Sequence, residues 1–182
     1  GADGRVYVGS ENEFGFLEIG KSGKVKFKSL TNLIDSSETN FGDIWKTVPL
    51  RNSIIFMSSS KLFIYDGNKI DIIEGAGKIQ NSFLVDNMFF VLDIEKGLYR
   101  LIANELRLIE NTKMFSDNEL YVLLHHKHNL LYGVTNKSGI YLINYFADKN
   151  LVNYYKVNSE IDDFLVENQL YAGSKLSKGK FS

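Results

Sequence analysis

The sequence predicts an all-β fold, and within that class a β-propeller with four-stranded antiparallel blades. Three observations support it: a repeated strand phrase, a composition suited to sheets, and turn signals at short intervals. In the phrase, an aromatic-centred strand and a short polar break precede a strand led by Gly or Lys. Its five copies lie 34 to 49 residues apart, and propeller blades repeat roughly every 40–50 residues. The central aromatics are Tyr7, Phe56, Phe90, Tyr132 and Tyr171.

Each copy of the phrase extends to four strands, because an inner strand precedes it and an outer strand follows it. Four-stranded antiparallel units in tandem are typical of propeller blades. We therefore expect one domain over residues 1–182, with blades at 4–29, 43–74, 79–110, 118–156 and 160–182. The predicted inner strands are Asp43–Val48, Ile79–Val85, Glu119–Leu124 and Ile161–Val166.

Local patterns identify the remaining elements. Lys24–Lys28 alternates polar and apolar residues, which predicts an outer strand with one solvated face. Asp66, Gly67 and Asn68 separate two apolar runs and predict a hairpin turn. Leu30–Asn40 has no strand pattern, so either a helical turn or a mobile loop is expected there.

The terminal copies of the phrase are incomplete. The first begins at its second strand and the last ends near its third, and both Val6–Val8 and Gln169–Ala172 supply a second strand. The sequence therefore favours an incomplete arc of about 4–5 blades over a small closed ring, because propellers have about 4–8 blades. The start at Gly-Ala-Asp suggests an excised segment. Open edges of an arc invite homodimerisation or pairing with further blades of a parent chain.

Composition excludes several classes of function. The 182 residues are 44% hydrophobic and 24% charged, with a net charge of −1. This balance argues against a nucleic-acid-binding surface, which needs a basic excess. No apolar run is long enough to span a bilayer. Cysteine is absent and no phosphate-loop motif occurs, so we expect neither a disulfide nor a cofactor.

Loop carboxylates are the first candidates for a ligand site. Glu11 and Glu13 follow the first strand of the phrase, and Asp93 and Glu95 occupy the corresponding hairpin of another copy. Glu11, Glu13 and Glu18 suggest a carboxylate pair for glycoside hydrolysis, but nothing in the sequence fixes the separation of two such groups. Polar residues at this hairpin are also explained as part of the repeat itself.

Trp45 and a histidine cluster are the other candidates. Trp45, the single tryptophan, lies on a predicted inner strand, where it either stacks on a ligand at the propeller mouth or packs between blades. His126 and His128 would share a face of a strand, as metal ligands require. They sit at a hairpin with no third ligand nearby in sequence, so we expect no metal site.

The phrase resembles a known family of repeats. Arg5–Leu17, Asn87–Leu101 and Asn129–Ile143 are similar to the propeller repeats of two-component-regulator sensor domains, common in Bacteroidetes. The Asn-Glu-Phe-Gly at residues 12–15 looks most like the regulators whose propellers precede a triple-tyrosine domain. Typical repeats carry Trp where this chain has Tyr7, Tyr132 and Tyr171, and Lys61 replaces the usual glycine.

The resemblance implies a non-catalytic, periplasmic sensor segment of a membrane-bound signalling regulator, often associated with a histidine kinase. Its expected ligand is a glycan or another small nutrient, and no ligand residues belong to the repeat motif itself. The sequence leaves two alternatives open. One is a protein-interaction scaffold propeller, and the other is a propeller glycoside hydrolase or lyase.

Overall fold

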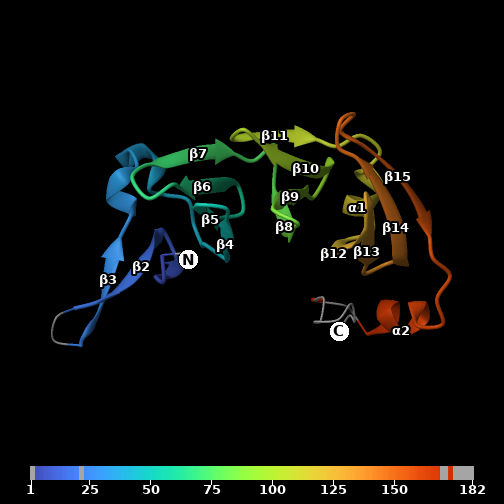
Figure 1. The fold of residues 1–182 in the computed structure, drawn as a ribbon, viewed down its shortest axis with the longest axis horizontal. Helices are drawn as coiled ribbons and strands as arrows, with labels where there is room; N and C mark the ends of the chain where they lie inside the picture. The colour runs from blue at the N-terminus through green and yellow to red at the C-terminus, as the bar shows by residue number, and fades with distance from the viewer. Residues whose placement is uncertain (1–2, 21–22, 169–171, 174–182) are drawn as a thin grey trace. The chain divides into compact units, whose positions relative to one another are not determined.

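The structure is a computed structural model that describes residues 3–20, 23–168 and 172–173. The chain divides into two compact units, Gly1–Ile79 and Gln80–Ser182. Each unit contains two antiparallel sheets (Figure 1). Every sheet is a meander whose strands neighbour one another in chain order, which is the topology of a propeller blade. The prediction of an all-β chain with blade-like sheets is confirmed.

The first unit holds a three-stranded first sheet, two short 3₁₀ helices and a four-stranded second sheet. Of the two alternatives left open for Leu30–Asn40, a helical turn or a mobile loop, the structure has the helical turn, as two 3₁₀ helices. The elements are β1 (Val6–Ser10), β2 (Glu13–Ile19), β3 (Val25–Ser29), η1 (Thr31–Leu33), η2 (Ser36–Glu38), β4 (Lys46–Leu50), β5 (Ser53–Met57), β6 (Lys61–Tyr65) and β7 (Ile70–Glu74).

Aromatic side chains form the core between these two sheets. Phe14 of β2 is fully buried, and its ring centroid lies 4.6 Å from that of Phe56 and 4.9 Å from that of Phe63. Phe41, in the segment that joins the sheets, adds a ring 4.7 Å from Phe63. Burying several large rings together supplies most of the hydrophobic stabilisation that a pair of small sheets needs.

The second unit holds a third and a fourth sheet, each four-stranded, and two short helices. Its elements are β8 (Ile79–Val85), β9 (Met88–Asp93), β10 (Gly97–Ile102), β11 (Glu105–Leu108), α1 (Lys113–Asp117), β12 (Leu120–Lys127), β13 (Leu130–Thr135), β14 (Gly139–Phe146), β15 (Leu151–Lys156) and α2 (Asp162–Glu167).

Buried and partly buried residues alternate strictly along β14, and this pattern shows how the fourth sheet packs. Tyr141, Ile143 and Tyr145 point to one face and join the buried core shared with the third sheet. Tyr145 contacts Phe90 of β9 edge to face at 5.7 Å, and its hydroxyl accepts a hydrogen bond from Arg100 of β10 at 2.9 Å. The period of two along the strand therefore selects the residues that hold the two sheets together.

Left-handed residues close the tight hairpins. Asp86 and Asn87 join β8 to β9 with φ of 47° and 60°, and Ala103 and Asn104 join β10 to β11 with φ of 49° and 61°. Two consecutive positive φ values characterise the two-residue turns that match strand twist. The predicted turn at Asp66–Asn68 is also found, with Gly67 at φ 105° between β6 and β7.

Two sequence predictions about strands differ from the structure. Ile161–Val166 was expected as an inner strand, but α2 forms there, with Asp162 and Asp163 in its first turn. Acidic residues near a helix N-terminus are electrostatically favoured, and Ile161 and Leu165 reach one side of the helix at i and i+4. The strands expected next, in 168–182, lie almost entirely outside the described residues.

The second difference concerns β3. Its alternation predicted one solvated face, yet Val25 and Phe27 on the other face are 61% and 46% exposed. The strand forms as expected, and its register with β2 places Leu17 opposite Phe27. The apolar face is present in this sheet but is not buried by the described residues.

Candidate functional site

The five candidate residues fall in separate units, so each group is described within its own unit. Glu13 is held by the first sheet: its Oε1 accepts hydrogen bonds from Ser29 Oγ at 2.7 Å, Thr31 Oγ1 at 3.0 Å and the Phe14 amide at 3.1 Å. These bonds tie the start of β2 to the end of β3 and to η1. Glu13 therefore orders the hairpin, which agrees with the reading of this position as part of the repeat.

Glu11 and Trp45 lie near each other along the connection between the first two sheets. Glu11 forms a single antiparallel bridge with Asp43, and Ile44 packs directly on Gly9. Trp45 precedes β4, is 41% exposed and donates its backbone N–H to the Met57 carbonyl at 3.1 Å. Because Trp45 is partly exposed, it remains a candidate for ligand contact in the first unit.

Burial also affects the residue after this tryptophan. Desolvation lowers the pKa of the Lys46 ammonium, because an amine in a partly apolar environment is easier to deprotonate. Lys46 lies opposite Met57 in the pairing of β4 with β5.

Asp93 and Glu95 share the β9–β10 hairpin but have different environments. Asp93 is only 2% exposed, and its Oδ1 accepts the amides of Glu95 at 2.9 Å and Lys96 at 2.8 Å. Its Oδ2 is buried and accepts no hydrogen bond from the described residues. Burial, followed by the negative charge of Asp93, raises the pKa of the Tyr99 hydroxyl. Glu95 is exposed, so the two carboxylates do not share a role.

The histidine cluster closes the β12–β13 hairpin. His125 Nδ1 lies 3.2 Å from an Asp86 carboxylate oxygen, and its Nε2 lies 3.1 Å from the His128 carbonyl. His126 instead packs against Tyr132 in a tilted arrangement, with ring centroids 4.6 Å apart. Within 3–20, 23–168 and 172–173, no group of three or more potential metal-ligating side chains is found.

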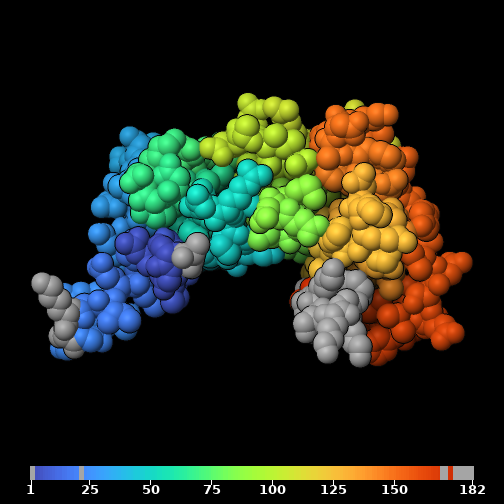
Figure 2. Space-filling model, in the orientation of Figure 1, coloured from blue at the N-terminus to red at the C-terminus, as the bar shows by residue number. Residues whose placement is uncertain are grey.

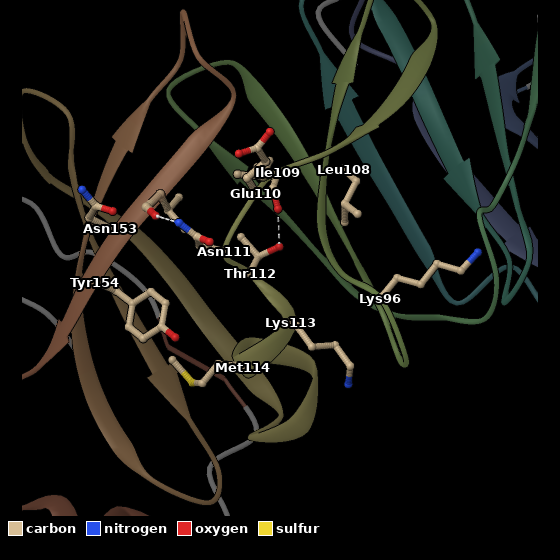
Figure 3. Close-up of a pocket in the computed structure, with 11 residues that line it drawn as sticks. Lys96, Leu108, Ile109, Glu110, Asn111, Thr112, Lys113, Met114, Asn153 and Tyr154 are labelled. Carbon is tan, nitrogen blue, oxygen red and sulfur yellow. Dashed lines mark hydrogen bonds between the residues drawn. The ribbon is translucent and has the colours of Figure 1, made fainter.

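A hollow in the second unit lies on the connector from β11 to α1. This groove encloses about 700 Å³. In Figure 3, Lys96 and Lys113 extend on one side of the connector, and Asn153 and Tyr154 of β15 lie on the other. Its lining residues are Lys96, Leu108, Ile109, Glu110, Asn111, Thr112, Lys113, Met114, Val152, Asn153 and Tyr154.

Hydrogen bonds to β15 fix the connector that forms the floor of this groove. The Glu110 amide donates to the Asn150 carbonyl at 3.0 Å, and the Val152 amide donates to the Glu110 carbonyl at 3.2 Å. Asn111 has φ 63° and its Nδ2 donates to the Val152 carbonyl at 3.3 Å. A fixed backbone presents its polar side chains in one arrangement, which lowers the entropic cost of binding.

Thr112 anchors the other side of the connector to the third sheet. Its buried Oγ1 accepts the Leu98 amide at 2.9 Å and donates to the Ile109 carbonyl at 2.7 Å. Next to it, Tyr154 is 37% exposed and packs its ring 5.1 Å from the buried Phe115 of α1. The groove therefore offers one supported aromatic surface with the Asn111 amide and the Lys96 and Lys113 side chains around it (Figure 3).

An ion pair and a hydrogen bond from Glu119 join the residues before β12 to the β13–β14 hairpin. Glu119 Oε1 lies 2.8 Å from Lys137 Nζ, and its Oε2 accepts Asn136 Nδ2 at 3.2 Å. The hydrogen bond from Lys137, followed by that from Asn136, lowers the pKa of the Glu119 carboxyl below its ordinary 4.5. The charged form is therefore the one that stabilises the fold.

We expect Glu119→Gln to lower the free energy of unfolding by about 0.5–1 kcal/mol at pH 7, the size of a partly exposed ion pair. A carboxyl with a depressed folded-state pKa stabilises above its unfolded pKa, and this contribution disappears as pH falls through the folded pKa. The difference between wild type and variant should therefore shrink below about pH 4.5. Chemical denaturation across pH 3–7 measures it.

Glu105→Gln is the matched control, because Glu105 pairs with Arg107 at 3.3 Å with both side chains more than half exposed. This variant should change stability by no more than a few tenths of a kcal/mol at any pH. An equal effect of both substitutions would show that the bonds of Glu119 to Lys137 and Asn136 add no more stability than an exposed ion pair does.

The chain was compared with protein-family models and with curated proteins, and neither comparison found a match.

The groove residues were missed by sequence reasoning. Asn111 and Thr112 follow β11 as Asn-Thr, which reads as an ordinary turn before a helix. Asn153 and Tyr154 lie within a strand whose aromatic residues match the sheet pattern. The groove forms only because the connector packs against β15. No spacing of residues along the sequence predicts that contact.

Proposed function

We propose that this chain is a non-catalytic ligand-sensing segment of a membrane-bound two-component-type regulator, exposed outside the cytoplasm, and that the groove in the second unit receives its ligand. The groove carries the proposal, because it combines a supported aromatic ring with a rigid polar floor. The blade-like sheets and the repeat phrase support the sensor class. Within the described residues, no helix has the length and apolar character needed to cross a bilayer.

The chemistry of the groove favours a short glycan. Sugar rings pair an apolar C–H face with peripheral hydroxyls, so they suit an aromatic surface flanked by amides. Tyr154 provides the surface, and Asn111 provides an amide beside it. Lys96 and Lys113 bring ammonium groups to the groove, Lys113 is ion-paired with Asp117, and Glu110 adds a carboxylate, so the lining carries charges of both signs and suits neutral as well as acidic sugars.

The roles of two candidate carboxylates support binding without catalysis. Glu13 accepts three hydrogen bonds that order a hairpin, and Asp93 accepts two backbone amides in another. Groups held in this way maintain turn geometry, whereas a general acid must reach a glycosidic oxygen.

We expect short oligosaccharides of galacturonic acid or glucose to bind the chain, and Tyr154→Ala to weaken that binding at least tenfold. Loss of one supported aromatic contact is worth about 1.4 kcal/mol, which is a factor of ten in affinity. Isothermal titration calorimetry against both sugar series measures the effect.

Tyr155→Ala is the matched control, because Tyr155 is the next residue and projects from the opposite face of β15, at 60% exposure. It should bind as the wild type does. The proposal fails for this groove when neither sugar series binds, or when Tyr155→Ala weakens binding as much as Tyr154→Ala. The signalling part fails when the full-length gene encodes neither a leader nor a membrane helix.

A scaffold role is the second candidate function, and one observation favours it. The first sheet exposes an apolar face that includes Ile19 at 75% and Val25 at 61% exposure. Exposed apolar surface of this kind marks protein–protein contact sites.

A further inference from the structure

The fourth sheet is apolar on both of its faces. Its inner face, which includes Leu131 and Ile143, packs in the core shared with the third sheet. Side chains alternate along a strand, so the residues between these point to the opposite side, the outer face. In the strand register, Val134 lies between Val122 and Ile140, and Leu124 lies opposite Tyr132. These five residues give the outer face a continuous apolar surface: Val122, Leu124, Tyr132, Val134 and Ile140.

The start of α2 covers this outer face without closing on it. Val157 and Ile161, which precede α2, and Leu165 within it line a pocket of about 470 Å³ together with the five residues of the outer face. We call it the apolar pocket. Leu165 is only partly buried and Ile161 is 50% exposed, so the helix wall and the sheet wall are not packed on each other throughout. Figures 1 and 2 show this part of the chain, from β15 to α2, in orange to red.

Polar contacts fix α2 beside the sheet. The Val157 amide donates to the Ile140 carbonyl at 2.8 Å, which continues the strand pairing beyond β15. The Asp162 carboxylate lies against Gly139, where a Cβ would come within 2.6 Å of Oδ1, and its Oδ2 lies 3.7 Å from Lys156 Nζ. The absence of a side chain at Gly139 therefore lets the helix approach β14. A pocket whose walls are held in place needs little reorganisation to bind a ligand.

The lining of the apolar pocket selects for a neutral ligand. Of the described residues that line it, none has a charged side chain and most are branched aliphatics. Burial of an unpaired charge in such a site is costly. Ser159, also in the lining, accepts the Ile161 amide on its Oγ at 3.3 Å, which leaves the hydroxyl hydrogen able to donate to a ligand oxygen. The chemistry therefore fits an apolar body with one oxygen acceptor.

The size of the apolar pocket suits a small molecule. Small-molecule sites usually enclose about 300–1,000 Å³ and combine apolar walls with a few polar groups. An ordered water molecule needs about two to four polar partners. Apolar walls provide few of these partners, so replacing the water in the pocket by a hydrocarbon is favourable.

We propose that the apolar pocket binds a neutral, mostly apolar small molecule, of the class of medium-chain alcohols and ketones, whose oxygen accepts a hydrogen bond from Ser159. The hydrocarbon body packs between the outer face and α2, so binding removes apolar surface on both walls from water. None of the described residues lines both this pocket and the groove proposed for the glycan. The apolar pocket is therefore a second site, with a different ligand chemistry.

Fluorescence titration of the whole 182-residue chain with N-phenyl-1-naphthylamine, a neutral apolar probe, tests the proposal. We expect saturable binding with one site per chain, and displacement of the probe by decanol. Decanoate should displace it at least tenfold less well, because the carboxylate would have no charged partner in the pocket. Absence of saturable binding would overturn the proposal, and equal displacement by decanoate would overturn the neutral ligand class.

A pair of variants on α2 locates the bound probe. Leu165 lines the apolar pocket, whereas the neighbouring Phe164 is 64% exposed and is not part of the lining. Leu165→Glu should therefore weaken probe binding at least tenfold, and Phe164→Glu should bind as the wild type does. Val134→Trp fills the pocket from the sheet side and should also weaken binding at least tenfold, with an unchanged circular dichroism spectrum. This variant tests the site independently of the folding of α2.

Ile19→Glu controls for binding to exposed apolar residues of the first unit. Ile19 is 75% exposed on the first sheet, so this variant should bind the probe as the wild type does. Weaker binding by Ile19→Glu together with normal binding by Leu165→Glu would overturn the assignment to the apolar pocket. Leu165→Glu should leave sugar binding unchanged, so failure of the apolar pocket and failure of the proposed function are distinguishable.

Discussion

Replacing Phe56 with alanine is expected to lower the stability of the first unit by about 3–5 kcal/mol, the usual cost of truncating a buried phenylalanine. Phe56 is fully buried, and its ring lies 4.6 Å from Phe14 and 6.1 Å from Tyr7. Truncation leaves a cavity between the two sheets that β-strand backbones are too constrained to collapse. Because Trp45 is the single tryptophan and lies in this unit, its fluorescence during urea unfolding reports the change.

The control for this prediction is Phe164→Ala. Phe164 is a phenylalanine on α2 that is 64% exposed, so its truncation should cost well under 1 kcal/mol. A Phe56→Ala variant that lost less than about 1 kcal/mol would show that the two sheets are not held together by this aromatic cluster.

Replacing Gly97 with alanine is expected to destabilise the second unit by about 2–4 kcal/mol. Gly97 has φ 121°, and a Cβ there would lie 2.6 Å from Thr112 Oγ1 and 3.0 Å from the Thr112 carbonyl carbon. The cost combines backbone strain of about 1–3 kcal/mol with overpacking of similar size. The start of β10 and the connector that lines the groove would both have to move.

Gly67→Ala is the matched control, because Gly67 has φ 105° but no atom within 4 Å of the added methyl. It should show the strain cost without the clash. Hydrogen exchange of the Leu98 amide gives a second readout, since its acceptor is Thr112 Oγ1 at 2.9 Å. Faster exchange of Leu98 in Gly97→Ala is expected, and equal stability losses at the two glycines would contradict the clash.

The strands could be predicted from the sequence because their signals are local. The phrase around Phe90 and Tyr132 places an apolar-aromatic strand beside a turn, and β9 and β13 form there. The Ile161–Val166 segment was wrongly predicted as a strand, because its four apolar residues fit a strand as well as they fit a short helix. Its two aspartates were the signal for the helix, and they were outweighed by the expected repeat.

The candidate site was harder to predict because it depends on tertiary contacts. Glu13 and Asp93 stand out in the sequence as loop carboxylates, yet the structure uses them to hold turns. Asn111 and Asn153 are 42 residues apart in sequence and line the same groove only because the connector is hydrogen-bonded to β15. Charge and spacing along one chain carry no information about such a contact.

The division of the chain into two units, each with its own pair of sheets, also bears on its fate under stress. Each unit has its own hydrophobic cluster, so we expect a substitution in one cluster to destabilise the unit that contains it first. The species that accumulates first is then a half-folded chain with a released blade pair rather than a random coil. Such a chain exposes unpaired strand edges and aromatic side chains, which proteases and chaperones recognise. Quality control would therefore act on half of the molecule while the other half is still native.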